Sequence, residues 1–416
     1  MPLPPVSEPV RTEFRRLWAD LAPIGRDPAS GGYRRFAWTS ADLTLREWFA
    51  AEARRRGLDL TTDRFGNQWA WWGDPDAALA AGVRSIVTGS HLDSVPDGGA
   101  FDGPLGVASA FAALDSLREN GFTPTRPIAV TNFLDEEGAR FGVACMGSRV
   151  LTGAISPERA LSLTDAEGTS MAEAMRAAGH DPEAVGADPQ TLARIGAYVE
   201  LHIEQGRGLV DLGRPVAVGS AVWPHGRWRI DIPGEANHAG TTRLEDRRDA
   251  MLGLAALVLA ARRAAQHHQG VATVGKVHVV PGGVNAIPSL STGWLDARAE
   301  HEAAVRAIVT EVAGVMDDFD ATLTEESWTP NTPFDGPLVA ALADRLGGIP
   351  VLSTGAGHDA GILANAGHRT AMLFVRNPTG ISHSPAEFAE EEDCIRGVGA
   401  LAACLATLSA HPVSSS

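Results

Sequence analysis

Cysteine is scarce in this sequence, with 3 among 416 residues. Cys145, Cys394 and Cys404 are too few and too scattered for a disulfide framework or a zinc knuckle. We therefore expect buried, reduced thiols and a cytoplasmic protein.

Basic residues are fewer than acidic ones, and long apolar runs are also scarce. Lys and Arg number 35 against 51 for Asp and Glu, and the net charge of -16 repels a phosphate backbone or an anionic lipid surface. The start of the chain has no basic segment followed by an apolar one, and we find no apolar run of membrane-spanning length. We therefore predict no secretory signal, no nucleic-acid partner and no membrane partner.

The composition is that of a globular protein. Hydrophobic residues make up 44% of the chain and charged residues 21%, which is close to the usual values. Because 416 residues exceed the size of one ordinary core, we expect two domains.

The first half of the chain alternates helical and strand-like segments. Helices are expected at residues 39–57 and 104–120, and strands at 67–73, 84–95 and 127–136. This alternation predicts an α/β fold with a mainly parallel sheet flanked by helices. Because such sheets bind ligands beyond the carboxyl ends of their strands, the polar residues that follow the strands are candidates for a site.

A different pattern begins near Trp223. The expected order is strand 227–234, helix 246–268, strands 272–280 and 291–299, helix 302–319 and strand 321–328. This βαββαβ order is typical of a ferredoxin-like α+β domain. A linker-like stretch follows, and α/β character then resumes. We therefore predict a first domain in two parts, residues 1–221 and 332–416, with a second domain inserted at 222–331.

Three adjacent acids, Asp135, Glu136 and Glu137, follow an apolar strand. Neighbouring side chains on a strand point to opposite faces and adjacent carboxylates repel, so the cluster requires either water or a cation. A solvated turn and a metal site are the two interpretations of this stretch.

Several stretches place histidine or carboxylate beside glycine or short polar residues. They contain His91 with Asp93, Asp102, Glu136 with Glu137, His202 with Glu204, and His383. A lone histidine in such a turn is more often a surface or hydrogen-bonded residue than a ligand. The set as a whole, however, supplies the imidazole and carboxylate mixture that binds Zn²⁺ or Mn²⁺.

The residue types suggest how such a site is arranged. Asp102, beside a glycine, can approach and bridge two metals. Asp93 lies two residues after His91 and can orient its imidazole. Glu137 can act as a ligand while Glu136 stays unligated as a base, so that cations remove the repulsion within the acidic cluster.

Seven stretches together resemble the signature set of the aminoacylase and carboxypeptidase family of binuclear metallohydrolases. They are GSHLDSVPDGGAFDGPLGV, DEEGARF, ELHIEQG, GEANHAGTTRLEDRRDA, GGVNAIP, GAGHDA and GISHSPAE. The sequence is most similar to the amidase branch of allantoate amidohydrolase, N-carbamoyl-L-amino-acid hydrolase and ureidoglycolate hydrolase. The resemblance implies a metallopeptidase-like catalytic domain, an inserted lid and dimerisation domain, and a homodimer.

The resemblance also assigns metal ligands and a base. It implies two divalent metal ions per subunit, Zn²⁺ or Mn²⁺, with Co²⁺ or Ni²⁺ as alternatives. His91 and His202 would hold one metal, Glu137 and His383 the other, and Asp102 would bridge them. Glu136 matches the general base, which takes a proton from the attacking water and returns it to the leaving nitrogen.

Further positions match substrate contacts of the family. His238 matches a histidine that stabilises the oxyanion and reaches across from the partner subunit. Asn285 and Arg298 match residues that hold a substrate carboxylate. From the residues alone, a turn residue and a surface arginine are the favoured interpretations of these two. Other substrate contacts are implied for Gln205, Gly357 and His358.

Two departures from the family pattern concern the substrate. Arg243 stands where this branch commonly has a proline, and PGGVNAIP replaces a more usual NVVPG arrangement. We predict a metal-dependent amidohydrolase of purine catabolism that cleaves a C–N bond of a small carboxylated ureido compound, allantoate first, releasing ammonia and carbon dioxide. The alternatives are an N-carbamoyl-L-amino-acid hydrolase or other short N-acyl amino acid amidase and, in another class, a non-catalytic ligand-binding member.

Overall fold

The computed structural model describes residues 5–410, so the ends of the first and last predicted segments, residues 1–4 and 411–416, lie outside the described part. The chain divides into two compact units. Unit 1 comprises Met1–Ser220 with Pro333–Ser416, and unit 2 comprises Ala221–Thr332. The predicted boundaries lie within one residue of these; the lid and dimerisation roles of unit 2 stay predictions.

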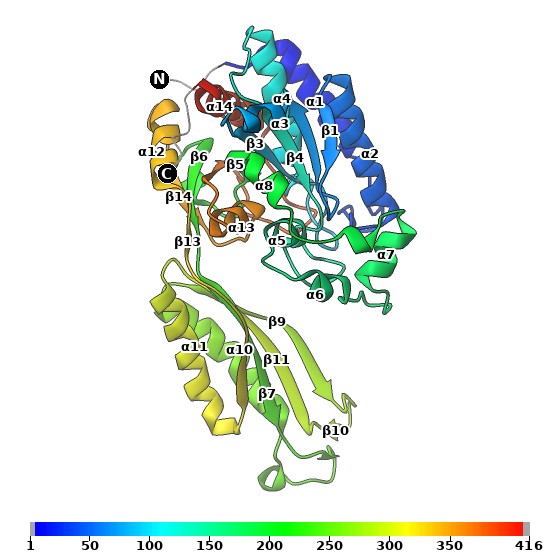
Figure 1. Ribbon diagram of the computed structural model, residues 1–416. Coiled ribbons are helices and arrows are strands. Elements are labelled where there is room, and N and C mark those ends of the chain that lie inside the picture. The colour runs from blue at the N-terminus through cyan, green and yellow to red at the C-terminus, as the bar shows by residue number, and fades with distance from the viewer. Residues whose placement is uncertain (1–4, 411–416) are drawn as a thin grey trace. The chain divides into compact units, whose positions relative to one another are not determined.

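Unit 1 contains a large sheet flanked by helices (Figure 1). Its strands are β1 (Asp59–Thr62), β2 (Gln68–Trp72), β3 (Ser85–His91), β4 (Ile128–Phe133), β5 (Ile195–Ile203), β6 (Val216–Val222), β13 (Thr332–Pro333), β14 (Val351–Thr354) and β15 (Thr370–Val375). Its longer helices are α1 (Glu8–Leu21), α2 (Ser40–Arg55), α4 (Pro104–Glu119), α12 (Gly336–Arg345) and α14 (Glu391–Ala410). Its shorter helices are α3 (Pro75–Ala80), α5 (Met146–Thr152), α6 (Pro157–Leu161), α7 (Met171–Ala177), η1 (Pro182–Ala184), α8 (Pro189–Arg194), α9 (Gly208–Asp211) and α13 (Asp359–Asn365).

The nine-stranded sheet has the order β1-β2-β4-β3-β5-β15-β6-β13, with β14 paired to β6. Its centre, β4-β3-β5-β15, is parallel, and β2 and β6 join that centre antiparallel. This confirms the predicted α/β class with a mainly parallel sheet. The expected strands at 67–73, 84–95 and 127–136 are β2, β3 and β4.

Burial explains why the strands and helices at the centre of unit 1 could be predicted from the sequence. Every residue of β3, β4 and β5 is buried, and α4 has almost no exposed face. Strands buried on both faces read as continuous apolar runs. Among the described helices, α14 alone has the length and hydropathy to cross a membrane, contrary to the expectation that no run would, yet 78% of its most apolar stretch is buried. It is therefore a core helix of unit 1.

Unit 2 has the predicted βαββαβ order (Figure 1). Its elements are β7 (His225–Pro233), β8 (Asn237–His238), η2 (Leu244–Asp246), α10 (Ala250–His267), β9 (Val271–Val280), β10 (Ala286–Ile287), β11 (Leu290–Arg298), α11 (Glu302–Met316), η3 (Asp317–Phe319) and β12 (Thr322–Thr329). The four-stranded sheet is antiparallel in the order β12-β7-β11-β9. Trp228, Ile230 and Ile232 alternate with more exposed residues along β7 and pack in a core with α10 and α11.

Candidate metal centre

The parallel strands of unit 1 bring the predicted metal ligands to one edge of the sheet. His91 is the last residue of β3, and His202 is the last but one residue of β5. Glu137 follows β4, and His383 lies in the loop after β15. Parallel strands end at the same edge, so ligands from segments nearly 300 residues apart in the sequence converge here.

Asp102 lies at the centre of this convergence. Its Oδ1 is 3.1 Å from Nε2 of His202 and 3.7 Å from Nε2 of His91. Its Oδ2 is 3.3 Å from Nε2 of His383, which is itself 3.7 Å from Glu137. The structure thus forms two groups of potential ligands, His91–Asp102–His202 and Asp102–Glu137–His383, that share one carboxylate.

The residue after Asp102 allows His91 to lie close to the backbone here. Gly103, which follows Asp102 and precedes α4, has a φ of 84°, in the left-handed region that favours glycine. A Cβ at this position would lie 2.4 Å from Cε1 of His91. A side chain here would therefore displace the imidazole.

Asp93 holds the acidic turn and His91 in place. Its Oδ1 accepts a hydrogen bond from the N–H of Glu136 at 3.1 Å, and its Oδ2 accepts one from the N–H of Glu137 at 3.0 Å. The same Oδ1 lies 3.3 Å from Nδ1 of His91. Asp93 thus lies where it could orient His91, although that role stays a prediction, and the fixed turn directs Glu136 and Glu137 to different positions.

Burial and mutual repulsion perturb the acids of the site. Burial and the nearby charge of Asp102 raise the pKa of Glu137 to about 7. Burial also raises the pKa of Glu136 well above its ordinary range. Burial disfavours the charged form of Asp102, but its hydrogen bonds to His202 and His383 outweigh that effect and hold its pKa well below the usual range.

The residues at this edge fit a metal centre. Glu137 Oε1 is buried and has no hydrogen-bond partner within the described residues, and the buried Nε2 of His202 faces Asp102 Oδ1 at 3.1 Å. Carboxylate oxygens and imidazole nitrogens that converge in this way are an arrangement that a cation satisfies. Imidazole nitrogens and carboxylate oxygens suit Zn²⁺, Mn²⁺, Co²⁺ and Ni²⁺.

Glu136 lies beside the ligand groups with its own partners. Its Oε2 is 3.7 Å from Nε2 of His91, and its Oε1 accepts a hydrogen bond from the thiol of Cys145 at 3.0 Å. Because burial and the nearby carboxylates raise the pKa of Cys145 well above its usual value, the thiol stays a donor. No motif connects Cys145 with the base, because this contact is tertiary.

The amide of Gln205 and the loop after β15 complete the surroundings of Asp102. Gln205 Nε2 lies 2.9 Å from Asp102 Oδ2, 3.1 Å from Ser382 Oγ and 3.3 Å from His383 Nε2. Its predicted substrate role stays a prediction, but it does lie at the site. Glu387, to which the sequence analysis assigned no role, accepts hydrogen bonds from the N–H groups of Phe101 and Asp102.

His358 and Gly357 precede α13. The ring of His358 is buried and lies edge-on to His202, with ring centroids 4.5 Å apart. Burial and the charge of His202 lower the pKa of His358 well below its usual value, so the imidazole is neutral. Gly357 is exposed. The structure thus places His358 directly against a candidate ligand, whereas its contact with a substrate stays a prediction.

The predicted substrate residues of unit 2 lie in two places. His238 on β8 pairs with Ala286 on β10, and the backbone oxygen of Asn285 accepts a hydrogen bond from the N–H of Ala239 at 3.0 Å. Arg298 is instead the last residue of β11. The eight residue steps from Leu290 to Arg298 span about 27 Å. The structure brings His238 and Asn285 together and places Arg298 at the other end of the strand.

Arg298 also has a partner within unit 2. Its Nε and Nη2 contact the two carboxylate oxygens of Asp296 at 2.7 and 3.0 Å. This bidentate pairing fixes the plane of the guanidinium. Arg243, the departure from the family pattern, is exposed and pairs with Asp246 and Glu245 around η2. Its effect on the substrate is not visible in these contacts.

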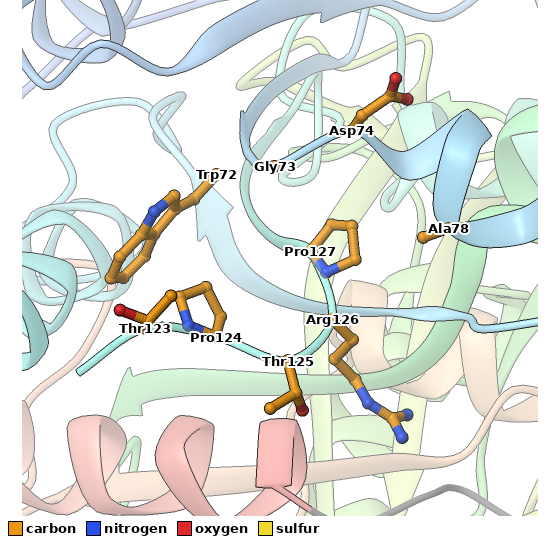
Figure 2. Close-up of a pocket in the computed structure, with 9 residues that line it drawn as sticks. All are labelled: Trp72, Gly73, Asp74, Ala78, Thr123, Pro124, Thr125, Arg126 and Pro127. Atoms are coloured by element: carbon orange, nitrogen blue, oxygen red, sulfur yellow. The ribbon is translucent and has the colours of Figure 1, made fainter. Parts of the chain in front are cut away.

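A separate hollow of about 340 Å³ lies elsewhere on unit 1 (Figure 2). It is lined by Trp72, Gly73, Asp74, Ala78, Thr123, Pro124, Thr125, Arg126 and Pro127. Trp72 pairs with Ile128 at the start of β4, so the hollow lies at the amino end of that strand, opposite to the ligand groups. It contains none of the predicted site residues.

Comparisons with known proteins show the family of the chain. The model of peptidase family M20/M25/M40 matches residues 87–407. An N-carbamoyl-L-amino acid amidohydrolase of Geobacillus stearothermophilus is 38% identical over 403 residues, which cover 93% of this chain and 96% of the relative. Allantoate amidohydrolase of Escherichia coli is 31% identical over 410 residues, covering 95% and 98%. Ureidoglycolate hydrolase of Arabidopsis thaliana is 30% identical over 402 residues, covering 92% and 83%.

Solved structures give the same result. A hydantoinase/carbamoylase family amidase from Burkholderia vietnamiensis superposes with a TM-score of 0.84 at 32% identity, covering 98% of this chain and 100% of the other. AtUAH in complex with glyoxylate superposes with a TM-score of 0.82 at 28% identity, covering 96% and 98%. The resemblance read from the motifs is therefore confirmed.

Proposed function

The chain belongs to peptidase family M20/M25/M40 and is an amidohydrolase acting on C–N bonds, and on that premise we propose that it cleaves the ureido group of a small carboxylate. One observation carries the proposal: the two oxygens of Asp102 face separate ligand groups, with the unligated carboxylate of Glu136 beside them. This arrangement supplies two metal positions and a base.

The proposed ligands are the residues of these two groups. His91 and His202 hold one divalent ion, Glu137 and His383 hold the other, and Asp102 bridges them. Bound there, the ions would lower the pKa of a water molecule and polarise the substrate carbonyl.

Glu136 performs the proton transfers in this proposal. Its carboxylate accepts a proton from the attacking water and donates it to the leaving nitrogen. The hydrogen bond from Cys145 and the fixed backbone N–H to Asp93 hold it at the site. Burial favours its protonated form, which suits the second transfer.

Two substrates are supported by separate observations. Allantoate is the first substrate predicted from the sequence, and a relative named allantoate amidohydrolase is 31% identical. The relative that is 38% identical is named for N-carbamoyl-L-amino acids. Both compounds carry a ureido group beside a carboxylate, so the same base and ligands serve either. Hydrolysis releases ammonia and carbon dioxide in both cases.

We propose that two copies of the chain form each active site. A small substrate cannot contact both Arg298 and the His238–Asn285 pair of one unit 2, because about 27 Å of strand separates them. His238 and Asn285 of one copy therefore serve a substrate whose carboxylate is bound by Arg298 of the other copy. In this proposal His238 stabilises the oxyanion.

The surface of unit 2 supports pairing of this kind. β9 is an edge strand, and its Val271 and Val277 are 54% and 53% exposed. On α10, which packs against β9, Leu252 and Leu259 are 65% and 62% exposed. An open strand edge beside an apolar helix face is suited to a second copy of the same chain.

The test is ammonia release by Mn²⁺-reconstituted protein. Allantoate and a series of N-carbamoyl-L-amino acids are the substrates, and chelated protein and the Glu136→Gln variant are the controls. We expect release from one of the two substrate types that falls by at least about 100-fold in the variant, because a general base contributes this much. The variant should still bind metal, because Glu136 is not a ligand.

Each outcome has a distinct meaning. Activity on allantoate supports a role in purine catabolism, and activity on N-carbamoyl compounds alone keeps the mechanism and changes the substrate. Wild-type protein that binds metal but releases no ammonia from any of these compounds would overturn the proposed substrate class. Full activity in the Glu136→Gln variant would overturn the assigned base.

A further inference from the structure

Glu387 connects two segments of the candidate metal centre. Its Oε2 accepts hydrogen bonds from the N–H groups of Phe101 and Asp102 at 2.8 and 3.0 Å. Its Oε1 accepts one from the hydroxyl of Ser382 at 3.3 Å, and that hydroxyl also lies 3.3 Å from Asp102 Oδ2. One buried side chain thus contacts the backbone of Asp102 and the residue that precedes His383.

Gly99 makes room for this contact. A Cβ on Gly99 would lie 2.2 Å from Oε2 of Glu387 and 2.5 Å from its Cβ. Real Cβ atoms do not approach other atoms so closely, so a larger residue would push the Glu387 carboxylate away. The chain therefore places a glycine where the carboxylate must reach the turn that precedes Asp102.

Packing alone does not account for a carboxylate here. Glu387 is 5% exposed and Asp102 is 6% exposed, and Ser382 Oγ is shared between their oxygens. Two buried carboxylates repel each other, so the pair requires positive charge nearby, which His202 and His383 supply at Asp102 and a bound cation would increase. The arrangement is expected where positive charge is bound beside it.

We propose that Glu387 is a positioning residue that fixes the direction of the two Asp102 oxygens toward their separate ligand groups. It acts through the backbone of residues 101 and 102 and is not itself a ligand. Since it also holds Ser382, it couples the turn of Asp102 to the loop of His383. This inference rests on the proposed function, because it assigns Asp102 the bridging role.

The direction of Asp102 matters because a bridging carboxylate must serve two partners at once. A rotation of the Asp102 backbone that improves one contact lengthens the other. Residues that orient metal ligands typically affect metal affinity or activity by about 10- to 100-fold when they are removed. If Glu387 only linked the two loops and did not orient Asp102, its removal would change the stability of the chain and not its metal affinity.

Zn²⁺ affinity is the first measurement, by competition with a chromophoric chelator on the full-length chain. The variants are Glu387→Ala, Glu387→Gln and Gly99→Ala. We expect about 10- to 100-fold weaker binding for Glu387→Ala. A smaller loss is expected for Glu387→Gln, because its amide oxygen still accepts the two N–H bonds. Gly99→Ala should resemble Glu387→Ala, because it displaces the carboxylate without removing it.

Asp335→Asn is the matched control. Asp335 also holds a backbone N–H, that of Leu338 at the start of α12, and pairs with Arg369. It should lower the melting temperature without changing Zn²⁺ affinity. The absorption spectrum of the Co²⁺-loaded chain provides a second reading, because it reports ligand geometry and should change in the Glu387 variants and not in the control.

The outcomes separate this inference from the proposed function. Wild-type Zn²⁺ affinity and an unchanged Co²⁺ spectrum in all three variants would overturn the role of Glu387 and leave the amidohydrolase proposal intact. A wild-type chain that binds no Zn²⁺ would overturn the metal centre and this inference with it. If Glu387→Ala does not fold, Glu387→Gln and Gly99→Ala decide the question.

Discussion

At the scale of single residues, the site combines groups that are unfavourable in isolation. Glu136 and Asp102 are buried acids and the side chain of Glu137 is 8% exposed, and buried carboxylates resist ionisation. In the chain without metal, His202 and His383 compensate the charge of Asp102. The hydrogen bond between His383 and Asp102 raises the pKa of His383 to about 9. Metal binding at these groups therefore releases protons and weakens as the pH falls.

The three cysteines give a direct test of the expected buried thiols. Cys145, Cys394 and Cys404 are all free and at most 3% exposed. Burial raises the pKa of Cys404 to about 12, and burial also raises the pKa of Cys145 and Cys394. Since the thiolate is the reactive form, we expect none to react quickly with a disulfide reagent in the native protein, and all to react after denaturation. A fast-reacting native thiol would contradict this.

Asp42 leads to a second prediction, which concerns how the free energy of unfolding depends on pH. Burial raises its pKa to about 6, against an ordinary value of 3.8, while the N–H of Trp38 donates to its Oδ2. The folded chain then binds more protons than the unfolded chain between about pH 4 and pH 6. The free energy of unfolding should therefore fall as the pH rises through this window, by about 3 kcal/mol from this group.

The Asp42→Asn variant isolates this effect, because its amide oxygen keeps the bond from Trp38. Thermal melts of the chelated protein at several pH values provide the measurement. The variant should gain stability relative to the wild type as the pH rises from 4 to 6. A difference that is constant across this range would show that folding does not raise the pKa of Asp42.

At the scale of elements, the ends of strands and helices determine the site. β3, β4, β5 and β15 carry the candidate ligands to one edge, and α4 begins two residues after Asp102. The N-terminal position before α4 needs glycine for two separate reasons. Its φ is 84°, and its hydrogens face the ring of His91.

We predict that Gly103→Ala weakens Zn²⁺ binding by at least about 10-fold through displacement of His91. Gly121→Ala is the matched control, because Gly121 also has a positive φ, of 68°, but lies in open space among the described residues. Each substitution should cost about 1 kcal/mol in backbone strain. Only the first should change metal affinity, measured by chelator competition. Equal affinity in the two variants would contradict the crowding of His91.

At the scale of the whole molecule, the proposed active site requires two copies. His238 and Glu136 then act in the same site but come from different chains. We predict that a His238→Ala chain and a Glu136→Gln chain, each inactive alone, recover activity when mixed. One quarter of the wild-type level per site is roughly the upper limit, since random pairing gives half heterodimers with one intact site each.

Subunit exchange must be verified for this test, for example with two affinity tags. Exchange without recovered activity would show that His238 serves its own chain or has no catalytic role. Sedimentation of the wild-type chain should give a dimer, and Leu259→Glu on the exposed face of α10 should shift it toward monomer. A wild-type monomer with full activity would contradict the shared site.

The sequence by itself determined the class of fold and the order of elements, and it indicated the candidate ligand residues. β3, β4 and α4 were predictable because full burial gives continuous apolar runs, and β7 because one buried face gives alternation. The candidate ligands were indicated by motifs that occur in order along most of the chain, and their role as ligands stays a prediction. Even so, α14 shows that hydropathy alone does not separate a core helix from a membrane span.

Only the tertiary structure decided which groups act together. Cys145 contacts Glu136, and Glu387 contacts the backbone of a residue 285 positions away. The separation of Arg298 from Asn285 likewise depends on how β11 extends between them. Local periodicity reports burial along one segment, whereas these contacts depend on sheet order and on loops that meet at the strand ends. Sheet order and the meeting of distant loops leave no pattern in a single sequence.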